Sequence, residues 1–104
     1  MIKSGVDLSN LQPQMAIAYT IACFVYQKHN VPCVITSAFD DVHKVNTLHQ
    51  RDGICRALDL RTNNLQPLDI PLVYSDLKNC LGDQFDVVLE KDHVHIEFDV
   101  HRAL

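Results

Sequence analysis

The sequence lacks the features that mark several protein classes. Its 104 residues include only three glycines and four prolines, and they contain no repeat, low-complexity stretch or linker. The nine Lys and Arg residues are scattered, and the formal net charge is -4. Because nucleic-acid binding depends on clustered positive charge, we expect no nucleic-acid partner. The chain length predicts a single domain over residues 1–104.

Long apolar runs are also missing. The longest apolar stretch extends from Met15 to Tyr26 and is interrupted by Tyr19 and Thr20. It is shorter than the ~20 residues that cross a bilayer. The first ten residues contain no apolar segment of the kind found in signal peptides. We therefore expect synthesis in the cytoplasm, no membrane partner and a monomeric chain.

The cysteines form no recognisable motif. The chain has four, and none forms a Cys-x-x-Cys pair or zinc-finger spacing; they are Cys23, Cys33, Cys55 and Cys80. In a reducing compartment they are expected to be thiols. Disulfides stay open as an alternative for a protein that works outside a cell.

The segments that are present predict an α+β fold. Apolar residues at helical spacing predict a helix over residues 11–30, with Ser9 or Asn10 as its cap and Pro13 in its first turn. Short strands are expected at 33–37 and 57–60, a second helix at 67–81, and a hairpin of strands 85–89 and 93–98. The prediction is a small antiparallel sheet with a C-terminal β-hairpin, packed against two main helices, with a zinc cleft on its open face.

The last predicted strand carries two histidines on one face. Side chains alternate along a strand, so His93, His95 and Glu97 face one way while the intervening apolar residues face the core. Two imidazoles two residues apart suit a single metal ion. A solvated strand face with two histidines is the alternative for this short motif.

A buried acid is predicted in the strand before. Asp59 lies between Leu58 and Leu60, so it faces away from the core, on the cleft side. A buried carboxylate is costly unless it is paired or ligating. A salt bridge to Arg56 or Arg61 is the alternative to a metal.

Three residues together predict a catalytic zinc site. His49 in the long polar stretch 38–56, Asp59 and His95 supply imidazole and carboxylate ligands, which zinc prefers, and leave its fourth position for water. One zinc ion is therefore expected as the cofactor. Asp92, three residues before His95, is the expected acceptor of the water's proton.

Three motifs resemble those of a known enzyme family. The chain resembles the zinc D-alanyl-D-alanine carboxypeptidases in three segments. These are Thr-Leu-His at 47–49, Arg-Ala-Leu-Asp-Leu-Arg-Thr at 56–62, and the segment 86–99 around Asp92-His93-Val94-His95. Murein endopeptidases and the hedgehog signalling domain share their fold, and small phage-encoded members are the most similar. The resemblance implies His49, Asp59 and His95 as metal ligands and Asp92 as catalytic base, with His93 assisting at the transition state.

Two departures from the family bear on metal and substrate binding. The family places the acid seven residues after the first histidine, whereas here the gap from His49 to Asp59 is ten, so His43 is an alternative ligand. The arginine that binds the substrate carboxylate in many members is absent from 38–41. Thr47, His43 and Arg56 are the substrate-binding candidates, with Arg51 and Lys44 as further cations.

The expected activity is cleavage of an amide bond in bacterial peptidoglycan stem peptides. The bond is either D-Ala-D-Ala or of the L-Ala-D-Glu type. A phage lysis enzyme fits the missing signal segment, because such enzymes act on the cell wall after release or as part of a phage particle. The alternative is a zinc-binding module of the same fold that has lost catalysis and attaches to a wall or virion.

Overall fold

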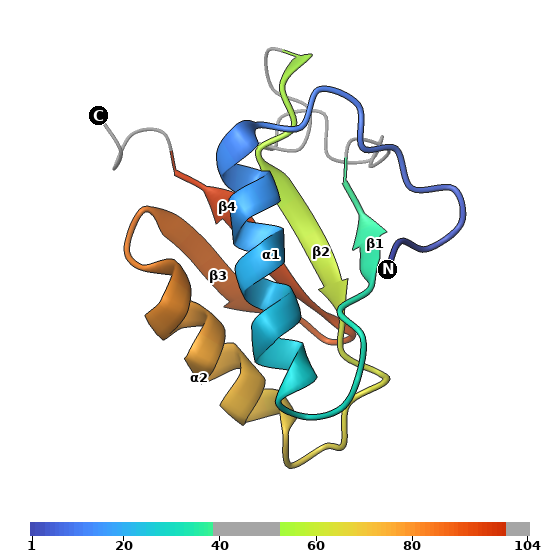
Figure 1. Cartoon of the computed structure of the whole chain (residues 1–104), viewed down its shortest axis with the longest axis vertical. Coiled ribbons are helices and arrows are strands. Elements are labelled where there is room, and N and C mark those ends of the chain that lie inside the picture. Colours follow the sequence, from blue (N-terminus) through green and yellow to red (C-terminus); the bar gives the residue numbers. More distant parts are fainter. Residues whose placement is uncertain (39–52, 100–104) are drawn as a thin grey trace.

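The computed structural model describes residues 1–38 and 53–99, which form two helices and four strands (Figure 1). These elements are α1 (Pro13–Gln27), β1 (Ile35–Ser37), β2 (Ala57–Arg61), α2 (Ile70–Leu81), β3 (Phe85–Leu89) and β4 (His93–Phe98). The predicted α+β fold with a C-terminal hairpin is confirmed, and the hairpin strands have the predicted bounds.

The four strands form one antiparallel sheet. Its strand order is β1-β2-β4-β3, so β4 lies between its hairpin partner β3 and the earlier strand β2. Ala57 to Arg61 pair residue by residue with Glu97 to His93. This pairing brings the two motif-bearing segments of the sequence side by side.

The hydrophobic core lies between the sheet and the helices. Figure 1 shows α1 and α2 on the same face of the sheet. The core is built from small and branched residues of α1 and α2 against alternate residues of β2 and β4, among them Ala18, Ala22, Val25, Val73, Leu77, Leu58, Leu60, Val94 and Ile96. Because strand side chains alternate, the residues between these core positions of β2 and β4 project from the other face of the sheet.

The start of α1 differs from the prediction. The residue before the helix is Gln12, with no side-chain capping bond, and Pro13 opens the helix as predicted. Neither Ser9 nor Asn10 is the cap, because the chain pairs with a distant segment before it turns: Cys55 N–H donates to Asn10, and Gln12 N–H donates to Cys55. A tertiary contact thus sets the start of this helix.

The second helix begins later than predicted. Residues 67–69 form a turn, and α2 starts at Ile70 with Pro71 in its first turn. Pro71, rather than Pro67, therefore takes the place that a proline favours at a helix start. Gly82 follows the helix with a φ of 81°, as expected for a glycine that ends a helix.

The first ten residues form an N-terminal arm, and its start lies beside the edge strand β1. Ile2 forms a parallel bridge with Ile35, and Lys3 N–H donates to the Ile35 carbonyl at 2.9 Å. The arm thereby carries the side chain of Lys3 to the sheet. All four cysteines lie among the described residues and are free thiols.

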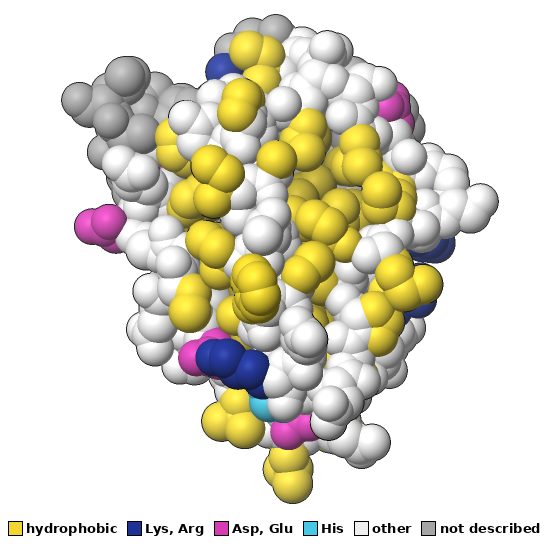
Figure 2. Space-filling model, in the orientation of Figure 1, with side chains coloured by type: hydrophobic (Ala, Val, Ile, Leu, Met, Phe, Trp, Pro, Cys, Tyr) yellow, Lys and Arg dark blue, Asp and Glu magenta, His cyan; other side chains and the backbone are white. Residues whose placement is uncertain are grey.

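The outward side of the helices is apolar over much of its area. Figure 2, which views the helix side, shows hydrophobic side chains spread across it. Ile17 and Phe24 of α1 and Leu72 of α2 are each more than half exposed. No helix among the described residues has the length and apolar character to cross a membrane.

Candidate metal centre

The candidate site is built on two neighbouring strands of the sheet. In the register of β2 and β4, Asp59 lies opposite His95, Arg61 opposite His93 and Ala57 opposite Glu97. Directly opposed residues on one face have their side chains in contact distance. The alternation that sends Leu58 and Ile96 into the core therefore places the polar residues on one surface.

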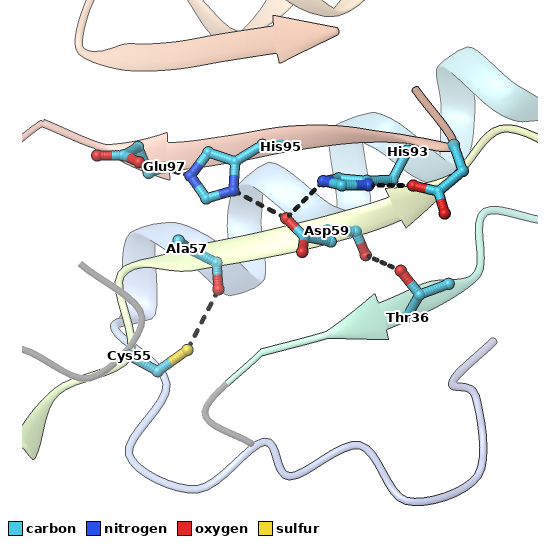
Figure 3. Close-up of polar contacts among 8 residues, drawn as sticks. Thr36, Cys55, Ala57, Asp59, His93, His95 and Glu97 are labelled. Carbon is cyan, nitrogen blue, oxygen red and sulfur yellow. Dashed lines mark hydrogen bonds and ion pairs between the residues drawn. The ribbon is translucent and has the colours of Figure 1, made fainter. Parts of the chain in front are cut away.

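Asp59 and His95 are in direct contact. Asp59 Oδ1 accepts a hydrogen bond from His95 Nδ1 at 2.8 Å (Figure 3). The Asp59 residue is only 5% exposed, which makes it one of the two buried polar residues of the described chain. Its backbone carbonyl also accepts a bond from the Thr36 hydroxyl at 3.3 Å, which links the site to β1. The predicted partnership of these two ligand candidates thus has a defined geometry.

Glu97 is a site residue whose role was not predicted from the sequence. Its Oε1 accepts a hydrogen bond from His95 Nε2 at 2.5 Å. The imidazole is therefore held at both nitrogens, by Asp59 on one side and Glu97 on the other. The period-two alternation that placed Glu97 beside His93 and His95 was the signal for this contact.

These two carboxylates keep His95 charged in the metal-free protein. Burial by itself lowers the pKa of His95, but the hydrogen bonds to Asp59 and Glu97 outweigh it and raise the pKa from 6.5 to about 9. At neutral pH the imidazolium donates from Nδ1 to Asp59 and from Nε2 to Glu97. A metal ion that binds at Nδ1 has to replace a proton there.

Asp92 and His93 form a second pair at the start of β4. His93 Nδ1 donates to Asp92 Oδ1 at 2.7 Å, and this hydrogen bond, with the nearby imidazole charge, lowers the pKa of Asp92. His93 Nε2 is buried, lies 3.7 Å from Asp59 Oδ1 and has no hydrogen-bond partner among the described residues. Figure 3 shows Asp59 facing both imidazoles.

The structure brings together four of the eight predicted site residues, namely Asp59, His95, His93 and Asp92. Arg56 lies just before β2, at the opposite end of that strand from Arg61, and it lines neither cavity described below. His43, Thr47 and His49 lie outside the described residues.

The described residues supply two of the three protein ligands expected for a catalytic zinc site. Asp59 Oδ1 and His95 Nδ1 are neighbouring carboxylate and imidazole atoms, the ligand types that zinc prefers. Residues 1–38 and 53–99 hold no group of three or more side chains able to bind a metal. A complete site therefore requires a third ligand from elsewhere in the chain, where the prediction places His49.

Two cavities adjoin the site face at opposite ends. The one at the His93 end has a volume of about 310 Å³ and is lined by Lys3, Thr36, Arg61, Asn63, Asp92 and His93. The other, about 560 Å³, lies between the end of α2 and β3 and includes Glu97 and Lys78 in its lining. The smaller cavity thus includes Asp92 and His93 of the site, whereas the larger one touches the site only through Glu97.

Comparisons with protein-family models, with curated proteins and with solved structures give no match to this chain.

Proposed function

We propose that this chain is a zinc-dependent hydrolase that cleaves an amide bond in bacterial peptidoglycan stem peptides. The observation that supports it most is the convergence of two histidine nitrogens on Asp59 Oδ1, at 2.8 Å from His95 and 3.7 Å from His93. The buried negative charge of Asp59 is costly unless a positive charge lies beside it. In the metal-free protein the protonated His95 provides that charge, and a divalent metal ion would provide it in the metal-bound protein. The motif resemblance supplies the substrate class.

Zinc, when bound, polarises a substrate carbonyl and makes a water molecule acidic enough to attack it near neutral pH. Asp59 and His95 would hold the ion, with His49 as the third ligand. Glu97 accepts the Nε2 proton of His95, which leaves Nδ1 toward Asp59 and fixes the tautomer.

Asp92 and His93 supply the proton transfer and the charge stabilisation. Asp92 is a carboxylate at neutral pH, as a proton acceptor must be, and it would take the proton of the attacking water and pass it to the leaving amine. The Asp92 contact orients the ring of His93, whose Nε2 faces the site. His93 then stabilises the negative oxygen that forms on the substrate carbonyl.

We further propose that the protein is a phage lysis enzyme and acts on the bacterial cell wall. A phage lysis enzyme acts on the wall after release from the host cytoplasm or as part of a phage particle, and the motifs are most similar to those of small phage members of the family. A zinc-binding attachment module without catalysis is the alternative outcome of the following test.

The test is digestion of purified peptidoglycan by the full chain reconstituted with zinc. We expect released amine groups and, in mass spectra, stem peptides shortened at either D-Ala-D-Ala or L-Ala-D-Glu. A chelator should abolish the release, and zinc should restore it. Asp92→Asn, which retains the size of the side chain, is the matched control and should bind zinc without releasing peptide. Zinc binding and wall binding without cleavage would show the attachment module, whereas a chain that takes up no zinc would contradict both.

A further inference from the structure

The smaller cavity continues the candidate site beyond His93. Its volume is about 310 Å³, and Asp92 and His93 form one of its walls. The other walls come from three separate segments: Lys3 of the N-terminal arm, Thr36 of β1, and Arg61 with Asn63 at the end of β2. A ligand group in this cavity would therefore touch the two residues assigned to proton transfer and charge stabilisation.

The cavity carries an excess of positive charge. Lys3 and Arg61 are two permanent cations, against the single carboxylate of Asp92, which is already bonded to His93 at 2.7 Å. Within the described residues, neither the Lys3 ammonium nor the Arg61 guanidinium forms an ion pair with a carboxylate. An anionic group is the ligand chemistry that this lining fits.

Arg61 is held firmly by its backbone. Its N–H donates to the Val34 carbonyl at 2.9 Å, and its carbonyl accepts from the hydroxyl of Tyr26 at 2.8 Å. Tyr26 is fully buried in α1, so the end of β2 is tied to the core. The half-buried Arg61 side chain therefore starts from a fixed point, as a binding residue requires.

The strand register sets the distance between this cavity and the reacting centre. The Arg61–His93 pair is the next pair on the same face after Asp59–His95. Two residues along a strand correspond to about 7 Å. A ligand carboxylate three bonds from the cleaved carbonyl carbon would therefore lie toward the Arg61 end of β2.

Both candidate substrates have such a carboxylate. In D-Ala-D-Ala the last residue carries a free α-carboxylate on the carbon bonded to the amide nitrogen. In the L-Ala-D-Glu bond the D-Glu residue, which continues the peptide through its side chain, carries one at the same position. The group therefore belongs to the amine side of either bond.

We propose that Arg61 and Lys3 form a subsite that binds the α-carboxylate of the residue on the amine side of the cleaved amide. This subsite rests on the proposed hydrolase function for its natural ligand. Arg61 presents its fork of N–H donors to the carboxylate, and the exposed Lys3 adds charge from the arm. The subsite makes the protein select a free carboxylate over an amide, and it fixes which side of the bond faces the end of β2.

Binding to the zinc-free full chain tests the subsite without any hydrolysis. D-alanine and D-glutamate are the probes, D-alaninamide is the uncharged comparison, and chemical shifts of the Arg61 and Asn63 amides report binding. We expect the wild type to bind D-alanine at least about tenfold more tightly than D-alaninamide. Arg61→Ala should remove this preference, Arg61→Lys should keep part of it, and Lys3→Ala should reduce it a few-fold.

Lys78→Ala is the matched control, because Lys78 is a cation that lines the other cavity. It should bind both probes as the wild type does. Arg61→Gln, which keeps a polar side chain, replaces Arg61→Ala if thermal unfolding shows that the latter is not folded. The ratio of the affinities for D-alanine and D-alaninamide is the decisive measurement, because general damage to the site would weaken the binding of both equally. Equal binding of acid and amide by the wild type, no binding of either, or an unchanged preference in Arg61→Ala and Arg61→Gln would overturn the subsite.

Kinetics with the zinc-loaded chain separate this proposal from the hydrolase proposal. If wild type cleaves the stem peptide, Arg61→Ala should raise KM about tenfold or more for peptides with the free carboxylate and leave zinc content unchanged. Cleavage with an Arg61-independent KM would remove the subsite and keep the hydrolase. Binding of D-alanine through Arg61 with no cleavage of any stem peptide would keep the subsite and remove the hydrolase.

Discussion

The six residues of β4 are divided between two faces of the sheet, and the two faces have different requirements for their side chains. Toward the helices the strand presents Val94, Ile96 and Phe98, which are at most 6% exposed. Away from the helices it presents His93, His95 and Glu97, each half-buried and each bonded to a carboxylate or an imidazole. On the first face any apolar side chain of suitable volume would serve. On the face of His93, His95 and Glu97, each side chain must place particular atoms against a particular partner.

This contrast predicts how substitutions divide. Changes on the helix side should lower the free energy of unfolding and leave the chemistry of the folded molecules intact. Changes on the other side should alter metal binding or hydrolysis with a smaller effect on the fold.

The largest effect is expected from Asp92 and His95. Asp92→Ala should abolish hydrolysis and leave zinc content near one ion per chain, because it removes the proton acceptor and no ligand. His95→Ala should lose both. Elemental analysis and peptide release on the same samples measure the two properties. If Asp92→Ala strips the metal, Asp92 is a ligand and the assigned roles are wrong.

The third ligand should come from residues outside both faces of β4. His49→Ala is expected to weaken zinc binding by orders of magnitude, whereas His43→Ala should raise KM or lower turnover with zinc retained. Competition with a chromogenic chelator measures affinity for both variants. The reverse result would assign the ligand to His43 and make the spacing from His49 to Asp59 irrelevant.

A core substitution on the helix side should act on stability alone. Ile96 is fully buried, and Ile96→Ala should lower the free energy of unfolding by about 2–5 kcal/mol. Val88→Ala on the neighbouring strand is the control, because Val88 is 44% exposed and should cost far less. Urea unfolding with zinc-free protein measures both. Loss of zinc stoichiometry in folded Ile96→Ala would show that the two faces are not independent.

The pH dependence should come from the polar face. The folded pKa of His95 is about 9, above its unfolded value of 6.5, so its contribution to the stability of zinc-free protein is complete below pH 6.5. That contribution is about 3 kcal/mol, and it is lost as the pH rises through about 9. Because zinc must displace the proton on Nδ1, apparent zinc affinity should rise about tenfold per pH unit up to pH 9. Urea unfolding and chelator competition across this range test both trends, and a flat zinc affinity from pH 7 to 9 would contradict this account.

The smallest effect is expected at Glu97. Glu97→Ala removes one of the two carboxylates that raise the pKa of His95, so zinc affinity should level off at a lower pH than in wild type. Above that pH, where no proton competes, the variant should bind zinc about tenfold less tightly, because Nε2 has lost the acceptor that orients the ring. Glu97→Gln retains an acceptor and should recover most of the high-pH affinity. Identical pH profiles for all three proteins would show that Glu97 has no positioning role.

The sequence predicted the C-terminal hairpin better than the helix boundaries. Residues 85–89 and 93–98 have strict alternation and a short polar connection, which are local properties, and both strands were confirmed. The start of α1 was wrong by two residues, because the backbone of residues 10–12 pairs with Cys55. Local propensity contains no information about such a partner.

The contacts within the site were predictable in part. Alternation placed His93, His95 and Glu97 on one face, but their partners required the pairing of β2 with β4. From the sequence alone, Arg61 is only a candidate ion-pair partner for Asp59. In the structure Asp59 contacts His95 and His93, while Arg61 lines the adjoining cavity with Lys3. Lys3 could not be foreseen there, because the arm reaches the sheet through a bridge between Ile2 and Ile35.

The sequence by itself determined which side chains of each element face the core and which carry chemistry, because those assignments depend on periods of two and 3.6 residues within one segment. Tertiary structure alone decided which of these side chains meet. Asp59 and His95 are 36 residues apart, and only the register of two strands joined through a long connection puts their atoms 2.8 Å from one another. A shift of that register by one residue would leave each strand's pattern unchanged but would place Val94 or Ile96 opposite Asp59 and turn His95 toward the helices.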